Sequence, residues 1–182
     1  MNNENLSDDE LVSWATQANG GEAFACLIRR YQARIIRFAA RFFNGNLDSG
    51  ADIAQDTFLR LWENRRTYEP RGKLLPYLLR IAYNLSLSRL RSPESKMGAL
   101  GDTQTENSRE VPMELALAVQ DAIQDLPEPQ RVVFLLHEYE GLSYQEIADV
   151  LTIAIGTVAS RKHSAVQALR VSLAPWFGRD NV

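Results

Sequence analysis

The side chains best suited to chemistry lie near the C-terminal end, on one face of a helix that the sequence predicts. This face carries Thr157, Ser160, Arg161 and Ser164, and Lys162 and His163 flank it. The spacing of i, i+3, i+4 and i+7 places the first four residues on the same side of an α-helix. Short polar and cationic side chains near the start of a helix can reach base edges and phosphates in the DNA major groove. Four polar residues alone would favour the simpler interpretation, the solvated face of an ordinary amphipathic helix.

The residues before this face favour DNA reading over a merely solvated helix. Ser143 and Glu146 stand in the S-x-x-E relation of a capping box, which predicts a short helix ending near Leu151. The run Gly-Thr-Val at 156–158 then predicts the start of a second helix, which continues to about residue 173. Two helices joined by a tight turn, with the small Ala148 where they would cross, form the helix-turn-helix arrangement.

The sequence offers no set of residues for catalysis or metal binding. The two histidines, His137 and His163, stand 26 residues apart and have no His or Cys partner at ligand spacing. There is no Ser/His/Asp group, no phosphate-binding loop and no prominent pair of carboxylates, so we expect no enzyme and no cofactor. The single cysteine, Cys26, allows no internal disulfide and is expected to be a small buried residue. Without an apolar leader or a long apolar run, the chain is expected to be cytoplasmic, with no membrane insertion.

Charge is distributed unevenly along the chain. The net charge is only -3, but residues 29–91 contain thirteen Lys and Arg against five acids. Residues 157–182 contain four Lys and Arg against one acid, and the intervening stretch is acidic. A phosphate-binding surface requires local rather than total positive charge, so both basic blocks are candidates for nucleic-acid contact.

The elements that position these residues are expected to be helices only. Apolar residues repeat at spacings of three and four, and alternating strand patterns are nearly absent. Residues 92–113 are polar and aperiodic and contain Pro93 and Pro112, which is typical of a flexible linker. The predicted fold is therefore all-α, with two small helical domains at 1–91 and 114–182 joined by this linker.

Two separate sets of motifs resemble bacterial sigma factors. Leu-Pro-Glu-Pro-Gln-Arg at 126–131, Gly-Leu-Ser-Tyr-Gln-Glu-Ile-Ala at 141–148 and Gly-Thr-Val-Ala-Ser-Arg at 156–161 resemble region 4, most closely that of the extracytoplasmic-function group. Asp-Ile-Ala-Gln-Asp-Thr-Phe-Leu-Arg-Leu-Trp at 52–62 resembles the region 2 helix that docks on the polymerase clamp. Leu-Leu-Arg-Ile-Ala-Tyr-Asn at 78–84 resembles the helix that opens the minus-10 element. The resemblance implies a region 2 bundle of four-helix type in the first domain and a region 4 helix-turn-helix in the second.

This resemblance implies three contact surfaces and three partners. Polymerase binding is expected at Asp52, Gln55, Asp56, Phe58 and Arg60, and minus-10 DNA contact at Arg66, Tyr68, Arg71, Lys73, Tyr77, Arg80, Asn84 and Arg91. Minus-35 DNA contact is expected at Ser143, Tyr144, Thr157, Ser160, Arg161, Lys162 and His163. The implied partners are core RNA polymerase, through its largest-subunit clamp coiled coil and its flap region, promoter DNA and an anti-sigma factor.

Several positions depart from the family pattern and leave two alternatives open. Ser88 stands where family members usually have Asp, and Tyr77 where they usually have Trp. Ala159 and Ser164 stand where basic residues are common. One alternative is an autonomous helix-turn-helix regulator, which would bind its operator without polymerase, typically as a dimer. The other is a sigma-like mimic that binds regulators rather than DNA.

Overall fold

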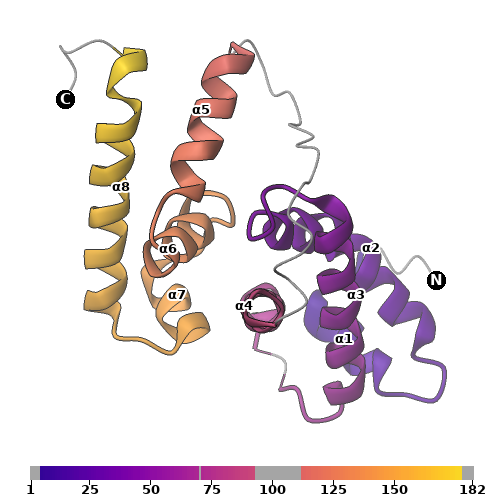
Figure 1. Ribbon diagram of the computed structural model, residues 1–182. Coiled ribbons are helices and arrows are strands. Elements are labelled where there is room, and N and C mark those ends of the chain that lie inside the picture. The colour runs from indigo at the N-terminus through magenta and orange to yellow at the C-terminus, as the bar shows by residue number, and fades with distance from the viewer. Residues whose placement is uncertain (1–4, 70, 93–111, 178–182) are drawn as a thin grey trace. The chain divides into compact units, whose positions relative to one another are not determined.

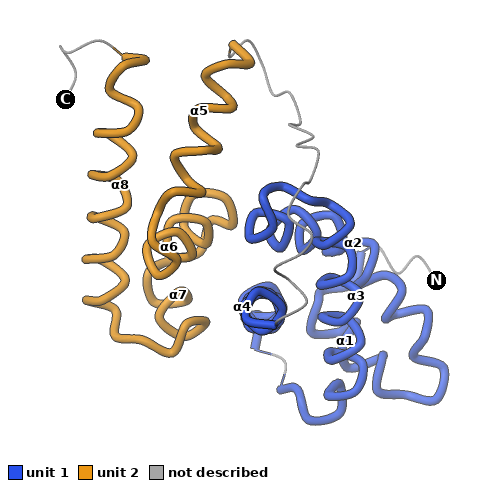
Figure 2. Tube along the Cα trace, viewed as in Figure 1, with its two compact units in different colours: residues 1–102 blue, residues 103–182 orange. Residues whose placement is uncertain are grey.

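The computed structural model describes residues 5–69, 71–92 and 112–177, and every regular element in these ranges is an α-helix (Figure 1). The chain divides into two compact units, Met1–Asp102 and Thr103–Val182 (Figure 2). The prediction of an all-α fold is thus confirmed. Apart from its ends, the predicted linker at 92–113 lies outside the described residues, so its flexibility stays a prediction.

The first unit contains the four helices that the apolar spacings predict. These are α1 (Asp8–Ala15), α2 (Gly21–Ala40), α3 (Leu47–Asn64) and α4 (Leu74–Arg91). Helix α2 packs against each of the other three, and α3 also packs against α4. The largest side chains that are fully buried here include Leu11, Leu27, Ile35, Phe38, Ile53, Leu61, Leu78 and Leu79. Cys26 is also buried, as expected.

Local sequence signals determine where these helices begin. Ser7 caps α1 and forms a reciprocal capping box with Glu10. The hydrogen bonds from Ser7 lower the pKa of the Glu10 carboxyl. Asn46 caps α3 by accepting a hydrogen bond of 2.8 Å from the backbone of Ser49. Between α2 and α3 the chain turns at Asn44 and Gly45, which adopt positive φ angles of 53° and 81°.

Helices α2 and α3 approach each other closely at a glycine. A Cβ atom added to Gly50 would lie 2.5 Å from the carbonyl oxygen of Ile36 and 3.1 Å from the Cβ of Ala40. Only a residue without a side chain fits there, so Gly50 allows the two helix backbones to pack at short range.

The second unit consists of α5 (Met113–Gln124), α6 (Glu128–Glu138), α7 (Tyr144–Leu151) and α8 (Ile155–Phe177). Helices α5, α6 and α7 all pack against α8 (Figure 1). Its core includes Val132, Val133, Leu135, Leu136, Ile147, Val158 and Ala165. The predicted capping box between Ser143 and Glu146 starts α7. Helix α8 begins one residue before the predicted start and extends four residues beyond the predicted end, with Pro175 inside it.

Candidate protein and nucleic-acid interfaces

The polar residues predicted for polymerase binding lie on the outer side of α3. Asp52, Gln55, Asp56 and Arg60 are all exposed. Phe58 differs, because it is only 5% exposed and its ring packs edge-on against Phe24 at a centroid distance of 6.5 Å. Position 58 lies on the same buried stripe as Ile53 and Leu61. Phe58 therefore packs in the core of the first unit and also lines the apolar groove between α2 and α3, and its contact with polymerase stays a prediction.

An apolar groove between α2 and α3, which the sequence reasoning missed, adjoins these polar residues. Its lining includes the apolar Phe24, Ile28, Leu59 and Trp62 and the polar Gln32, Asp52 and Gln55. Leu59 is 53% exposed although it is a large apolar residue. Phe24 and Trp62 contact each other edge-on at 4.9 Å, so the aromatic part of the groove is held in place. The sequence signal that could have revealed this groove is Leu59, a leucine on the otherwise polar side of α3.

Asp52 also forms an ion pair within the first unit. Its carboxylate lies 2.9 Å from a guanidinium nitrogen of Arg89, which links α3 to the end of α4. Both side chains are largely exposed, so the pair contributes little to stability. A change at Asp52 would therefore alter Arg89 as well as the α3 surface.

Polar side chains follow the outer face of α4, as the sequence predicts for the minus-10 contacts. Arg80, Asn84 and Arg91 are exposed and spaced so that they share this face. Tyr77 lies half-buried nearer the start of the helix. Two cations flanking an amide side chain on one exposed face suit the phosphates and base edges of a single strand.

The loop before α4 supplies the remaining predicted minus-10 residues. Arg66, Arg71 and Lys73 are exposed, and Arg71 pairs with Glu69. Tyr68 is half-buried, and its ring contacts that of Tyr77 at 4.8 Å. Burial raises the pKa of the Tyr68 hydroxyl to about 12, with a smaller contribution from the nearby Asp9 carboxylate. Tyr68 thus packs against the start of α4.

In the second unit, the predicted reading face lies at the start of α8. Ser160, His163 and Ser164 are exposed, while Thr157 and Arg161 are half-buried. The Ser160 hydroxyl donates a hydrogen bond of 3.0 Å to the carbonyl oxygen of Thr157. Of the two α7 residues assigned to this surface, Ser143 is engaged in the capping box and Tyr144 packs edge-on against His137.

Lys162 does not belong to this face, which corrects the sequence expectation. It is only 9% exposed, its ammonium lies 2.6 Å from a carboxylate oxygen of Glu138, and it approaches the ring of Phe134 to 5.5 Å. The pairing with Lys162 lowers the pKa of the Glu138 carboxyl. The physical reason is helical spacing, because position 162 lies on the inward stripe with Val158 and Ala165. Lys162 therefore links α8 to α6.

This contact predicts a measurable difference between two substitutions at Lys162. Lys162→Ala removes both the charge and the buried aliphatic stem, so we expect it to lower the free energy of unfolding by about 1–3 kcal/mol at pH 7. Lys162→Met keeps the apolar stem and should cost less than about 1 kcal/mol, because Glu138 is partly exposed. Urea unfolding of the full chain measures both.

The acid dependence of stability provides the control for the ion pair. The folded-state pKa of Glu138 is lowered, so the pair stabilises the fold above the ordinary carboxyl pKa of 4.5. This stabilisation is lost as the pH falls through the lowered folded-state pKa. The difference between the wild type and Lys162→Met should therefore shrink below about pH 4.5. If the stability difference between the wild type and Lys162→Met did not change with pH, the ion pair between Lys162 and Glu138 would not be its source.

Among the described residues, no group of three or more His, Cys, Asp or Glu side chains could hold a metal ion. In the same part of the chain, no helix is both long and apolar enough to cross a membrane.

Two known protein families match this sequence. The family description "Sigma-70 region 2" matches residues 27–95, and "Sigma-70, region 4" matches residues 116–169.

Whole proteins of known family are similar over most of the chain. The RNA polymerase sigma-H factor of Pseudomonas aeruginosa is 30% identical, and the match covers 92% of this chain and 94% of the relative. The ECF RNA polymerase sigma factor SigW of Bacillus subtilis is 31% identical, covering 84% and 89% respectively. Among solved structures, CnrH in complex with the cytosolic domain of CnrY is similar with a TM-score of 0.71 at 26% identity, covering 92% of this chain and 97% of that one.

Proposed function

This chain belongs to the extracytoplasmic-function group of the sigma-70 family and directs core RNA polymerase to promoters, and we propose that its two units divide this task. In the proposal, the first unit binds core polymerase and opens the minus-10 element, and the second unit reads the minus-35 element. The observation that carries it is that each unit matches a different sigma region and presents an exposed polar helix face of the kind that binds DNA.

For the first unit, we propose that the outer face of α4 and the loop before it hold the melted strand. Arg80 and Arg91 would contact phosphates, and Asn84 would border the pocket of an unstacked base. The exposure of all three side chains on one helix face supports this assignment. These three residues belong to the first unit, whereas α8 belongs to the second. A substitution on α4 should therefore affect strand opening without affecting duplex reading.

That separation predicts the behaviour of Asn84→Ala. We expect the variant polymerase to open promoters several-fold more slowly, because a base that has left the stack loses a hydrogen-bonding partner. Permanganate footprinting over time measures the opening. Binding of minus-35 duplex should be unchanged, and so should the free energy of unfolding, because Asn84 is exposed. Full opening at the wild-type rate would remove the assigned role of Asn84.

Each unit also has a surface suited to core polymerase. We propose that the groove between α2 and α3, with its rim of Asp52, Gln55 and Asp56, receives the clamp coiled coil of the largest subunit. For the flap region, we propose a second apolar groove along α6 and α8. Phe134, Val166, Leu169, Leu173 and Phe177 are among its lining residues. A groove of this composition suits an apolar side chain from a partner helix.

We further propose that an anti-sigma factor controls this chain. The support is the similar protein CnrH, which was solved in complex with a second protein, the cytosolic domain of CnrY. We propose that this chain likewise binds a second protein, which inhibits it. An inhibitor that covered the polymerase-binding grooves would block promoter recognition by competition alone. We also propose that the chain has no catalytic activity of its own and acts in the cytoplasm, where polymerase and chromosome meet.

Transcription from a library of promoter fragments tests the proposed function. Core polymerase supplied with this chain should produce transcripts from a defined subset of fragments, and core alone should not. The upstream sequences of that subset should share two short elements. Specific binding of the chain to DNA without polymerase, together with no dependent transcripts, would favour the autonomous regulator. Neither transcripts nor DNA binding would favour the mimic.

A further inference from the structure

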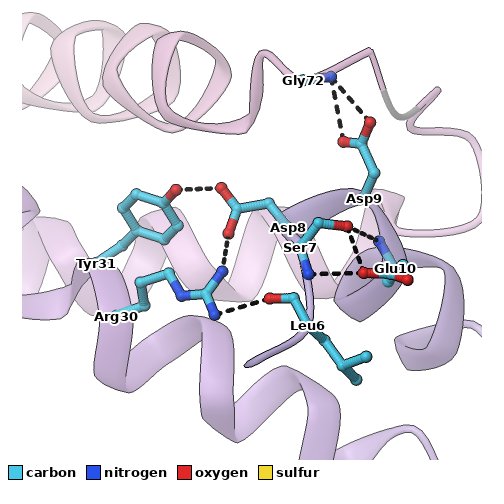
Figure 3. A network of polar contacts seen from close by, with 8 residues as sticks. All are labelled: Leu6, Ser7, Asp8, Asp9, Glu10, Arg30, Tyr31 and Gly72. Carbon is cyan, nitrogen blue, oxygen red and sulfur yellow. Dashed lines mark hydrogen bonds and ion pairs between the residues drawn. The ribbon is translucent and has the colours of Figure 1, made fainter. Parts of the chain in front are cut away.

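Helix α1 contacts both ends of the basic loop that precedes α4. Both carboxylate oxygens of Asp9 accept hydrogen bonds from the backbone N–H of Gly72, at 3.0 and 3.2 Å (Figure 3). At the other end, Nε of Arg65 donates a hydrogen bond of 3.1 Å to the carbonyl oxygen of Ala15, the last residue of α1. Arg65 and Gly72, at the two ends of the loop, are thus connected to a short helix that lies 50 or more residues earlier in the chain.

Helix α1 is itself held firmly against α2. The Asp8 carboxylate accepts from the Arg30 guanidinium and from the Tyr31 hydroxyl (Figure 3). Arg30 also donates a hydrogen bond of 3.0 Å to the carbonyl oxygen of Leu6. Burial and the hydrogen bond to Asp8 raise the pKa of Tyr31 well above its usual range. These contacts give Asp9 a fixed position relative to the core of the first unit.

Gly72 is the residue of the loop whose conformation needs an explanation. Its φ angle is +65°, which lies in the left-handed region that other residues rarely adopt. Glycine visits many other conformations at similar cost, so an additional contact is needed to hold this one. The Asp9 carboxylate supplies that contact, since it accepts the Gly72 N–H directly between Arg71 and Lys73.

We propose that Asp9 is a positioning residue, which holds the described parts of the loop, 65–69 and 71–73, so that their cations are already arranged for the melted DNA strand. This inference rests on the proposed role of the loop in minus-10 contact. A loop that is ordered before binding loses less conformational entropy on contact with a single strand. The same carboxylate could instead compete with a DNA phosphate for the Gly72 N–H, which predicts the opposite effect on promoter opening.

Amide hydrogen exchange of the full-length chain tests the contact itself. In Asp9→Ala, the Gly72 amide should exchange at least about tenfold faster than in the wild type, because its acceptor is gone. Asp9→Asn retains one acceptor oxygen and should give an intermediate rate. Glu22→Ala serves as the matched control, because it removes one exposed acid from the start of α2. Unchanged exchange at Gly72 in Asp9→Ala would overturn the proposal.

The rate of promoter opening then tests the consequence of the contact. With core binding unchanged, Asp9→Ala should open promoters several-fold more slowly, Asp9→Asn should be intermediate, and Glu22→Ala should match the wild type. Opening at or above the wild-type rate in Asp9→Ala, despite fast exchange at Gly72, would overturn the positioning role, and acceleration would favour competition with phosphate. Failure of the wild-type chain to open any promoter would instead contradict the proposed function, while the exchange data would still decide whether Asp9 holds the loop.

Discussion

Leu59→Asp is expected to weaken binding to core RNA polymerase by about thirtyfold to nine-hundredfold. Leu59 is 53% exposed beside Phe24 and Trp62, in an apolar groove that has a polar rim. An exposed apolar patch marks an interaction site, and a disruptive substitution at the centre of an interface costs about 2–4 kcal/mol. An aspartate there would also place an unpaired charge against the partner's apolar surface. Titration of core polymerase into the labelled full-length chain measures the change in affinity.

Leu47→Asp provides a matched control on the same helix. Leu47 is also exposed, but it is the first residue of α3 and does not line the groove. An acid at the start of a helix is favourable, so this variant should fold and should bind core polymerase as the wild type does. Equal affinity of Leu59→Asp and the wild type would contradict the assignment of the groove. Equal losses in both variants would show that the effect is not specific to it.

Leu59 is a sharper test of this surface than Asp52. The ion pair between Asp52 and Arg89 means that reversing the charge at Asp52 changes α3 and α4 together. Rim charges also act mainly through the rate of association, whereas buried apolar contacts determine how long a complex lasts. The salt dependence of binding therefore reports on the acidic rim, and the dissociation rate reports on Leu59.

Helix positions followed from the sequence because their determinants are local. The capping box predicted between Ser143 and Glu146 involves residues only three positions apart. The same is true of the polar face of α4, since spacing alone determines which side chains share a helix face. These features require no knowledge of how the helices pack.

Residue type was misleading where it disagreed with helical position. Lys162 is charged, which suggests a solvent-facing residue, yet its spacing from Val158 and Ala165 places it on the inward stripe. A lysine can occupy such a position because its aliphatic stem is apolar and its ammonium reaches the partly exposed Glu138. Phe58 shows the same effect of helical position, because it lies on the buried stripe of α3 and still lines the groove between α2 and α3.

Features that depend on tertiary packing could not be derived from local patterns. The groove beside Leu59 is lined by residues of both α2 and α3, which are brought together only by the packing of the two helices. The contact between Asp9 and Gly72 joins residues 63 positions apart. No periodicity or motif within either segment identifies the other as its partner.

Arg161→Ala is expected to cost about 1–3 kcal/mol of binding to the minus-35 element, if Arg161 reads a guanine edge. Arg161 lies near the start of α8 beside Ser160, and Lys162, the adjacent cation in the sequence, is engaged with Glu138. The reading face has Ala159 and Ser164 at positions where another cation would compensate. We therefore expect no neighbouring cation to compensate for the loss of Arg161.

A panel of promoter variants at two salt concentrations determines what Arg161 contacts. Loss of discrimination at a single base pair would assign it to a base edge. Uniform weakening across all sequences, with a salt slope lower by about one, would assign it to a phosphate. Lys162→Met should leave both discrimination and salt slope unchanged, because the Lys162 ammonium faces Glu138. If Arg161→Ala matched the wild type on every variant at both salt concentrations, α8 would not read DNA, and the sigma-like mimic would become the better account of the second unit.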